Sequence, residues 1–147
     1  AVLTIRQERW IHDVTRALSE KEPGMPRLRA LLPAMLALHE ADPDAWVVSR
    51  LCQNLSELDD TRDLAAEMTA RWVTLVADLI RDAQGAEANT LDAALVAKVL
   101  VGSFDGIKTT IGILTGHDSR ALDEQLVMAG RVLEQMLFSM LGNEAQR

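Results

Sequence analysis

The sequence predicts an all-α domain, built as a six-helix antiparallel bundle. Apolar residues recur three and four positions apart along almost the whole chain, which is the helical period. No segment alternates apolar and polar residues for long, and no Asn-Gly or Asp-Gly turn joins two such runs, so strand signals are missing. Of the 147 residues, 48% are apolar, which suffices for the core of a single domain. Tyr is absent and only three Trp and two Phe occur, so this core must be largely aliphatic.

The first half of the chain predicts three helices. The first runs from Val2 to Ser19 and is followed by a segment containing Pro and Gly. The second spans about Pro26 to Glu40. Pro33 lies inside it and predicts a kink or a late helix start, because proline removes a backbone donor and clashes with the preceding turn. Asp42-Pro43 opens the third helix, with Asp as the cap and Pro at the first position.

The second half predicts three longer helices. Apolar residues from Leu64 to Ala83 mark the buried face of the fourth helix, and Gly85 is its expected stop. Thr90 is the expected cap of the fifth helix, which runs from Leu91 to about Leu114. After a turn, the last helix covers about Arg120 to Leu141.

Three glycines interrupt the fifth helix, namely Gly102, Gly106 and Gly112. Each costs about 1 kcal/mol relative to Ala inside a helix. Their presence indicates a close approach of another backbone or of a ligand, or a bend. A poorly optimised helix is the alternative interpretation.

The last helix carries apolar residues with the 4-3-4-3-4 spacing of a heptad seam. Val127, Val132 and Leu137 lie off this seam. So wide an apolar surface needs more than one packing partner, which predicts a homodimer. The alternative is that the helix is buried wholly within its own core. The predicted interface residues are Leu122, Leu126, Ala129, Leu133, Met136 and Met140.

The composition narrows the possible partners. The formal net charge is −7, and no basic stripe for phosphate contacts is present, so direct binding of nucleic acid by this chain is not expected. Cys52 is the sole cysteine, which rules out an intrachain disulfide and favours a reducing compartment. No apolar run is long enough to span a bilayer and no signal-peptide pattern opens the sequence. We therefore expect a cytoplasmic protein without a membrane partner.

Enzyme signals are poor. His12, His39 and His117 are far apart and form no metal-binding pair, and we interpret each as a surface or helix-end residue. Cys52 is interpreted as a small core residue rather than a nucleophile. No Gly-rich phosphate loop or nucleophile elbow occurs. The sequence thus predicts a protein that is not an enzyme and that has no metal site and no cofactor.

A pocket for a small apolar molecule is the hypothesis that remains, because polar residues interrupt apolar helical faces at several points. Arg50 and Lys108 can pair with an acidic ligand group, or they are solvated. Trp72 offers a flat ring face and one N–H donor to a ligand, or it is a plain core residue. The candidate ligand-binding residues are Leu36, Arg50, Leu51, Asn54, Trp72, Leu75, Val76, Leu79, Phe104, Lys108 and Ile111.

The stretch RWVTLVADLIRDAQGAEANTLDAALVAKVLVGSFDGI at 71–107 resembles the C-terminal domains of the TetR repressor family. Those domains show a Trp-opened helix, a short loop after Gly, a small-residue-rich helix with a Gly-hydrophobic-Asp-Gly core, and a closing amphipathic helix, and all four appear here in order. The stretch RLRALLPAMLALHEADPDAWVVSRL at 27–51 is similar to the family's fifth and sixth helices. The resemblance implies that residues 1–147 form a ligand-binding and dimerisation domain of TetR type.

Within that family, the sequence is most similar to γ-butyrolactone autoregulator receptors. The matching pieces are VVSR at 47–50, Trp72, and VGSFDGI at 101–107. The matching Trp of those receptors lines the ligand pocket, which implies the same role for Trp72. Asp105 departs from the receptors, which often have a small residue there.

The resemblance also implies a mechanism. AVLTIRQERW resembles the helix that connects the family's helix-turn-helix domain to its C-terminal domain, so we expect that DNA-binding domain to precede Ala1 and this chain to be a fragment. DNA would be bound only through the missing domain, and a small apolar effector (butyrolactone-like, acyl or aromatic) would shift the connecting helix and relieve DNA binding. The alternative is a stand-alone helical dimeric interaction module without a small-molecule ligand, which predicts a well-filled interior.

Overall fold

The computed structural model describes residues 2–45, 47–48, 51, 54, 59–85, 91–116 and 118–145, and the regular structure in these ranges is entirely helical. The predicted all-α class is therefore confirmed. The predicted number of six helices is not tested, because residues 46–58, where the third helix was expected, are described only in part. The helices are α1 (Val2–Ser19), α2 (Met25–Arg29), α3 (Leu31–Ala41), α5 (Asp59–Gln84), α6 (Ala93–Leu114) and α7 (Ser119–Ala145).

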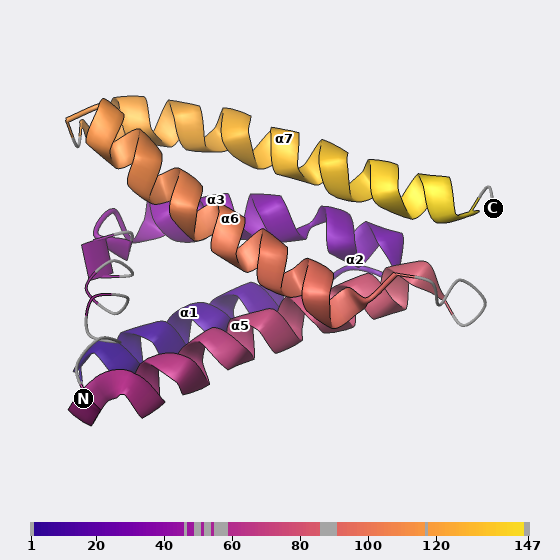
Figure 1. The fold of residues 1–147 in the computed structure, drawn as a ribbon, viewed down its shortest axis with the longest axis horizontal. Helices are drawn as coiled ribbons and strands as arrows, with labels where there is room; N and C mark the ends of the chain where they lie inside the picture. Colours follow the sequence, from indigo (N-terminus) through magenta and orange to yellow (C-terminus); the bar gives the residue numbers. More distant parts are fainter. Residues whose placement is uncertain are drawn as a thin grey trace.

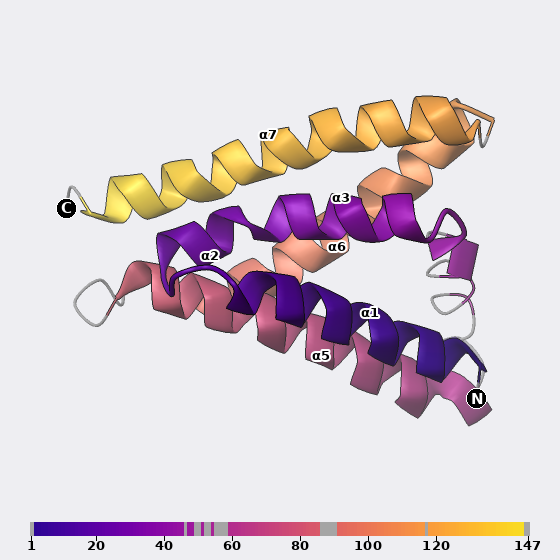
Figure 2. The same cartoon turned by 180° about the vertical axis from the view of Figure 1, so that it is seen from behind.

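The helices are arranged around α3 (Figures 1 and 2). Helices α1 and α5 lie side by side, and α3 lies between this pair and α7 in both views. Helix α6 starts next to the end of α5 and crosses the molecule to the start of α7. As a result, α5 and α6 are close together at one end and diverge toward the other.

Pro33 shapes the chain as expected. The predicted helix over 26–40 is divided, with α2 ending at Arg29 and α3 beginning at Leu31. Pro33 is thus the third residue of α3, where its missing N–H has no intrahelical partner to lose. Because the chain is helical already from Met25, the outcome is an interruption of the helix at Ala30 and not a late start.

The helix ends follow cap chemistry. Gly85 ends α5 with φ 71, the left-handed conformation that favours glycine, so the predicted stop is confirmed. The predicted start of α6 at Leu91 is wrong. The helix begins at Ala93, and the carboxylate of Asp92 accepts the N–H of Leu95 at 3.0 Å. A carboxylate satisfies a free N–H and also complements the helix dipole. Thr90, the expected cap, lies outside the described residues.

The main core lies where α5 and α6 approach each other. Ile80 of α5 is fully buried, and Ala93 and Ala97 of α6 are buried with it. Alanine side chains let two helix backbones come close, so these two residues define the narrow end between α5 and α6. The other buried members of this cluster are Val14, Leu18, Leu28, Val76, Ala77, Leu79 and Leu137.

Within this chain, no other segment comes close to Gly102 and Gly106 of the fifth helix. Both are exposed, and a Cβ atom at either position would meet nothing within 4 Å. The close approach occurs instead at Gly130 of α7, where a Cβ would lie 2.6 Å from Cδ1 of Leu32 on α3.

The heptad seam of α7 does not form one outward face. Leu122 and Leu126 are buried within the chain, so they are not available for a partner, while Ala129 and Leu133 are half-buried. The last two seam residues, Met136 and Met140, are 59% and 38% exposed. Because α7 is apolar around much of its circumference, the sequence spacing alone does not tell which of its rows faces the bundle.

Replacement of Ile80 by Ala tests the narrow end of the core. The free energy of unfolding is expected to fall by about 2–5 kcal/mol, since a fully buried aliphatic side chain is truncated and leaves a cavity. Urea denaturation measures this difference. The matched control is Ile5→Ala on α1, where the side chain is 66% exposed and the change should stay within about 0.5 kcal/mol. Equal losses for the two variants would contradict this account of the core.

Candidate ligand-binding cavity

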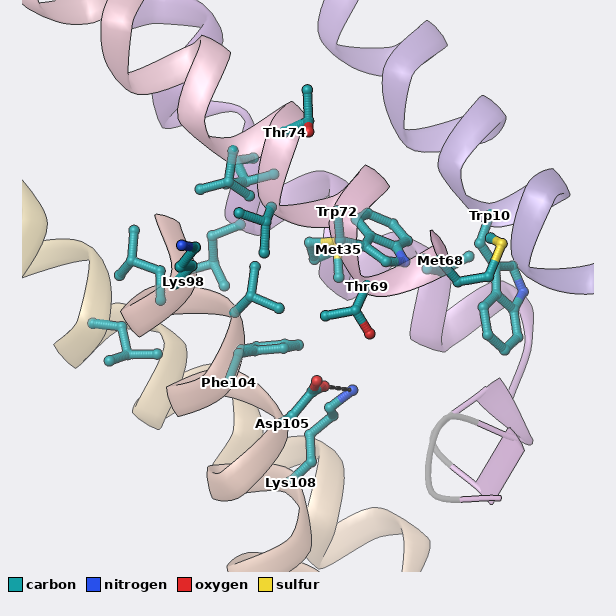
Figure 3. Close-up of a pocket in the computed structure, with 18 of the residues that line it drawn as sticks. Trp10, Met35, Met68, Thr69, Trp72, Thr74, Lys98, Phe104, Asp105 and Lys108 are labelled. Atoms are coloured by element: carbon teal, nitrogen blue, oxygen red, sulfur yellow. Dashed lines mark ion pairs between the residues drawn. The ribbon is translucent and has the colours of Figure 1, made fainter. Parts of the chain in front are cut away.

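A cavity of about 690 Å³ occupies the space where α5 and α6 diverge (Figure 3). Its wall is formed by residues from the first half of α5 and the middle of α6, with further residues from α1, α3 and α7. This volume is in the range of small-molecule sites. The same pair of helices therefore provides the core at its narrow end and the cavity at its wide end.

Most of the cavity wall is apolar. The indoles of Trp10 and Trp72, from α1 and α5, contribute two large flat surfaces. Met35 and Met68 add flexible thioether side chains, and Phe104 lies on the opposite side on α6. Aromatic faces together with methionines suit a ligand with an apolar ring or chain.

One part of the wall is polar, and we call His39, Asp105 and Lys108 the polar corner. The ammonium Nζ of Lys108 lies 2.9 Å from Oδ1 of Asp105, one helical turn away on α6. The Lys108 side chain is only 7% exposed, and its Nζ lies 5.2 Å from the centre of the Phe104 ring. A buried ammonium is tolerated when it is paired, so this ion pair explains how Lys108 can line an otherwise apolar cavity.

His39 completes the polar corner from α3. Its ring centre is 6.2 Å from that of Phe104. Burial is the main cause that lowers the pKa of His39 from 6.5 to about 4, and the nearby charge of Lys108 acts in the same direction. His39 is therefore neutral at physiological pH and can donate or accept a hydrogen bond without adding charge.

Asp42, just after the end of α3, holds α1 against the cavity. Trp10 Nε1 donates to its Oδ2 at 3.0 Å, Arg6 Nε donates to the same oxygen at 2.7 Å, and a second nitrogen of Arg6 pairs with Oδ1. We call this group the Asp42 clamp. The hydrogen bond from Arg6 is the main cause that lowers the pKa of Asp42 below its usual value. The clamp fixes the indole of Trp10, which forms part of the cavity wall.

Four of the predicted ligand-binding residues line this cavity, namely Trp72, Val76, Phe104 and Lys108. The other predicted residues that the structure describes do not line it. Leu79 and Ile111 are buried, Leu75 borders a shallow groove on the outer side of α5, and Leu36 is half-buried away from the cavity. Leu51 and Asn54 are exposed, and Arg50 lies outside the described residues. Helical periodicity identifies an apolar face, but it does not tell which part of that face borders a cavity.

Several lining residues were missed. Trp10 was not among the predicted ligand-binding residues, and Asp105 was noted only for its departure from the lactone receptors. His39 does lie in the last turn of its helix, as expected, but its ring faces the cavity. The one signal in the sequence was the ionisable residue Lys108 within an apolar helical face, three residues after Asp105.

Metal centres and membrane-spanning helices are both absent from the part of the chain that the structure describes. That part holds no cluster of three or more His, Cys, Asp or Glu side chains suited to a metal ion. None of its helices combines the length and apolar character needed to cross a bilayer. Cys52 and His117 fall outside the described residues, and the expected cytoplasmic location stays a prediction.

Residues 25–137, from the start of α2 into α7, match the family model for the C-terminal domain of BetI-type transcriptional repressors. The chain belongs to this family. It is thus a regulatory domain of the TetR type, which confirms that part of the resemblance, and the family consists of transcription regulators rather than enzymes. The closer likeness to γ-butyrolactone receptors stays a prediction. Comparison with curated proteins and with solved structures finds no match.

The Asp42 clamp in this TetR-type domain predicts a pH dependence. Because the pKa of Asp42 is lower in the folded state, the clamp stabilises the domain above the unfolded pKa of about 4 and loses this effect as the pH falls through the folded pKa. Asp42→Asn should therefore melt at a lower temperature than wild type near pH 7, and the difference should narrow below about pH 4. Thermal melts followed by circular dichroism measure it.

Asp44→Asn is the matched control for the clamp, because the Asp44 side chain is largely exposed and the substitution weakens a contact with Arg6 of 4.0 Å. This variant should change the melting temperature little. A difference between wild type and Asp42→Asn that stayed constant from pH 7 to pH 3 would refute the role given to the Asp42 carboxylate.

Proposed function

We propose that this chain is the effector-binding and dimerisation domain of its regulator, and that it senses a small apolar molecule whose binding relieves DNA binding. Regulators of this family bind DNA through an N-terminal domain, and the net charge of −7 on this chain fits a part that does not contact DNA itself. The observation that carries the proposal is the cavity of about 690 Å³ with two indoles in its wall.

The position of Trp10 supports a route from the cavity to the DNA-binding domain. Trp10 lines the cavity and belongs to α1, the helix that resembles the family's connecting helix. A ligand that fills the cavity presses on this indole and changes the geometry of the Asp42 clamp. In the proposed mechanism α1 then moves and alters the spacing of the two DNA-binding domains. A coupling of about 1–3 kcal/mol is typical of such regulation.

The alternative function, an interaction module without a ligand, predicts a well-filled interior. A cavity of this size is not expected there, since protein interiors pack as densely as organic crystals. The cavity therefore favours the sensor over the module. Butyrolactone-like, acyl and aromatic molecules are all candidate effectors for a cavity of this kind.

Exposed apolar residues on α6 and α7 support dimerisation. Leu95, Val99 and Ile113 form an exposed row on α6, and Met128 and Val132 begin an exposed row on α7 that continues to Met136 and Met140. We call these two rows the outer rows. Apolar surface on this scale is unusual for a monomer, and TetR-type domains generally form dimers. We propose that a second copy covers the outer rows and that Gly102 and Gly106, exposed on α6, allow its backbone to come close.

A fluorescent apolar dye tests the cavity. N-phenyl-1-naphthylamine should bind and increase its emission, and Thr69→Phe should weaken this binding about tenfold or more, because the Thr69 side chain points into the cavity (Figure 3) and a phenyl ring would occupy it. Thr15→Phe, at an exposed position of α1 away from the cavity, is the matched control and should leave the affinity unchanged. If Thr69→Phe bound the dye as tightly as wild type, the cavity would not be the binding site.

The dimer is tested by sedimentation equilibrium at micromolar concentration. Wild type should sediment as a dimer, and Val132→Glu, in the outer row of α7, should sediment as a monomer because it places charge in the interface. Val2→Glu makes the same change at an exposed position of α1 and should leave the dimer intact. A monomeric wild type would end the dimerisation part of the proposal.

A further inference from the structure

The polar corner allows the charge class of the ligand to be inferred, provided that the proposed sensing function is correct. Lys108 and Asp105 lie three residues apart on one helix, so their ion pair is formed before any ligand arrives. An ammonium group carries three N–H donors, and the contact with Asp105 Oδ1 engages one of them. The side chain of Thr69 points toward the same space from α5 (Figure 3).

The charges within the polar corner are balanced. The positive charge of Lys108 is matched by Asp105, and His39 is neutral. The other charged residues in the wall are Arg62, Lys98 and Glu134. Lys98 is ten residues from Lys108 on α6, or about 15 Å along the helix, and its side chain lies on the far side of Phe104 in Figure 3. Arg62 is in the first turn of α5 and exposed, and Glu134 comes from α7.

This balance disfavours a charged head group. An anion would compete with Asp105 for the ammonium and would place a second negative charge beside its carboxylate. A cation would meet the ammonium of Lys108, which lies 2.9 Å from the only carboxylate of the corner. Either arrangement leaves a net charge at the polar corner itself, where the Lys108 side chain is buried and an uncompensated charge is costly. An uncharged oxygen that accepts a hydrogen bond from Lys108 leaves the ion pair intact.

We infer that the effector is a net-neutral amphipathic molecule with a carbonyl-type oxygen, such as a lactone, ester, amide or ketone. Its oxygen accepts a hydrogen bond from Nζ of Lys108. Its apolar part lies against Trp72, Phe104 and Met35, which face the same space (Figure 3).

Competition against bound N-phenyl-1-naphthylamine tests this inference, since this reporter is uncharged and has no carbonyl group. The probes are γ-tetradecalactone, decanoate and decyltrimethylammonium, which carry an unbranched alkyl chain of nine or ten carbons and differ in head-group charge. The lactone should displace the reporter at a concentration about tenfold or more below that of either ion, as expected for one hydrogen bond to a charged group.

Two variants, each lacking one partner of the ion pair, should change the preference for charged probes in opposite directions. Lys108→Met leaves Asp105 as the sole charge of the corner. The affinity for decyltrimethylammonium should therefore rise about tenfold, and the lactone should no longer bind more tightly than the two ions. Asp105→Asn leaves Lys108 without its carboxylate partner, so the affinity for decanoate should rise instead. The affinity of the reporter verifies that each variant retains the folded cavity. A structural role alone for the ion pair would weaken all three probes equally.

The outcomes distinguish a failure of the inferred charge class from a failure of the proposed sensing function. Wild-type preference for the lactone, with the opposite shifts in the two variants, supports the inference. Preference for either ion in wild type, or displacement by none of the three probes, overturns it while the reporter still demonstrates a binding cavity. Failure of the reporter itself to bind refutes the proposed sensing function.

Discussion

The divergence of α5 and α6 is the constraint on which the rest of the structure depends. At the narrow end, Ala93 and Ala97 let α6 approach α5 closely enough to bury Ile80 completely. The two helices cannot stay in contact along their whole length, because α6 crosses the molecule to reach α7 (Figure 1). Dense packing at one end therefore leaves space at the other, and the side chains of α1, α3 and α7 line that space without filling it.

Trp72 connects the two parts of the core. It packs against the main cluster around Ile80 and also against a smaller cluster formed by Trp10, Ala45 and Val48. Trp72 and Trp10 both line the cavity. A molecule in the cavity therefore contacts both clusters at once, and the smaller one includes the residue that the Asp42 clamp holds. This arrangement gives the proposed signal a continuous packed route from ligand to α1.

The sequence predicted the helices well, because local periodicity, prolines and glycines encode them: α1 begins and ends at the expected residues, and Gly85 stops α5. It predicted the site only in part. Phe104 and Ile111 share the same apolar pattern on α6, yet one borders the cavity and the other is buried. That difference depends on the angle between helices, which arises from contacts distant in sequence. The same holds for α7, since Leu126 and Val132 are equally apolar but Leu126 is buried and Val132 is exposed.

In the proposed function, one face of helix α6 binds the ligand and another face contacts the second subunit. Phe104 and Lys108 line the cavity, while Gly102 and Gly106 are exposed beside the outer row that a second copy would cover. Each glycine weakens the helix by about 1 kcal/mol relative to alanine, so the segment between cavity and outer row is easier to deform than a helix of alanines. A ligand that binds Lys108 therefore acts on the wall that the two subunits would share. The charge balance of the polar corner then affects the structure of α6 as well as the affinity for the ligand. A neutral ligand fills the cavity without breaking the ion pair between Lys108 and Asp105, which spans this turn of α6.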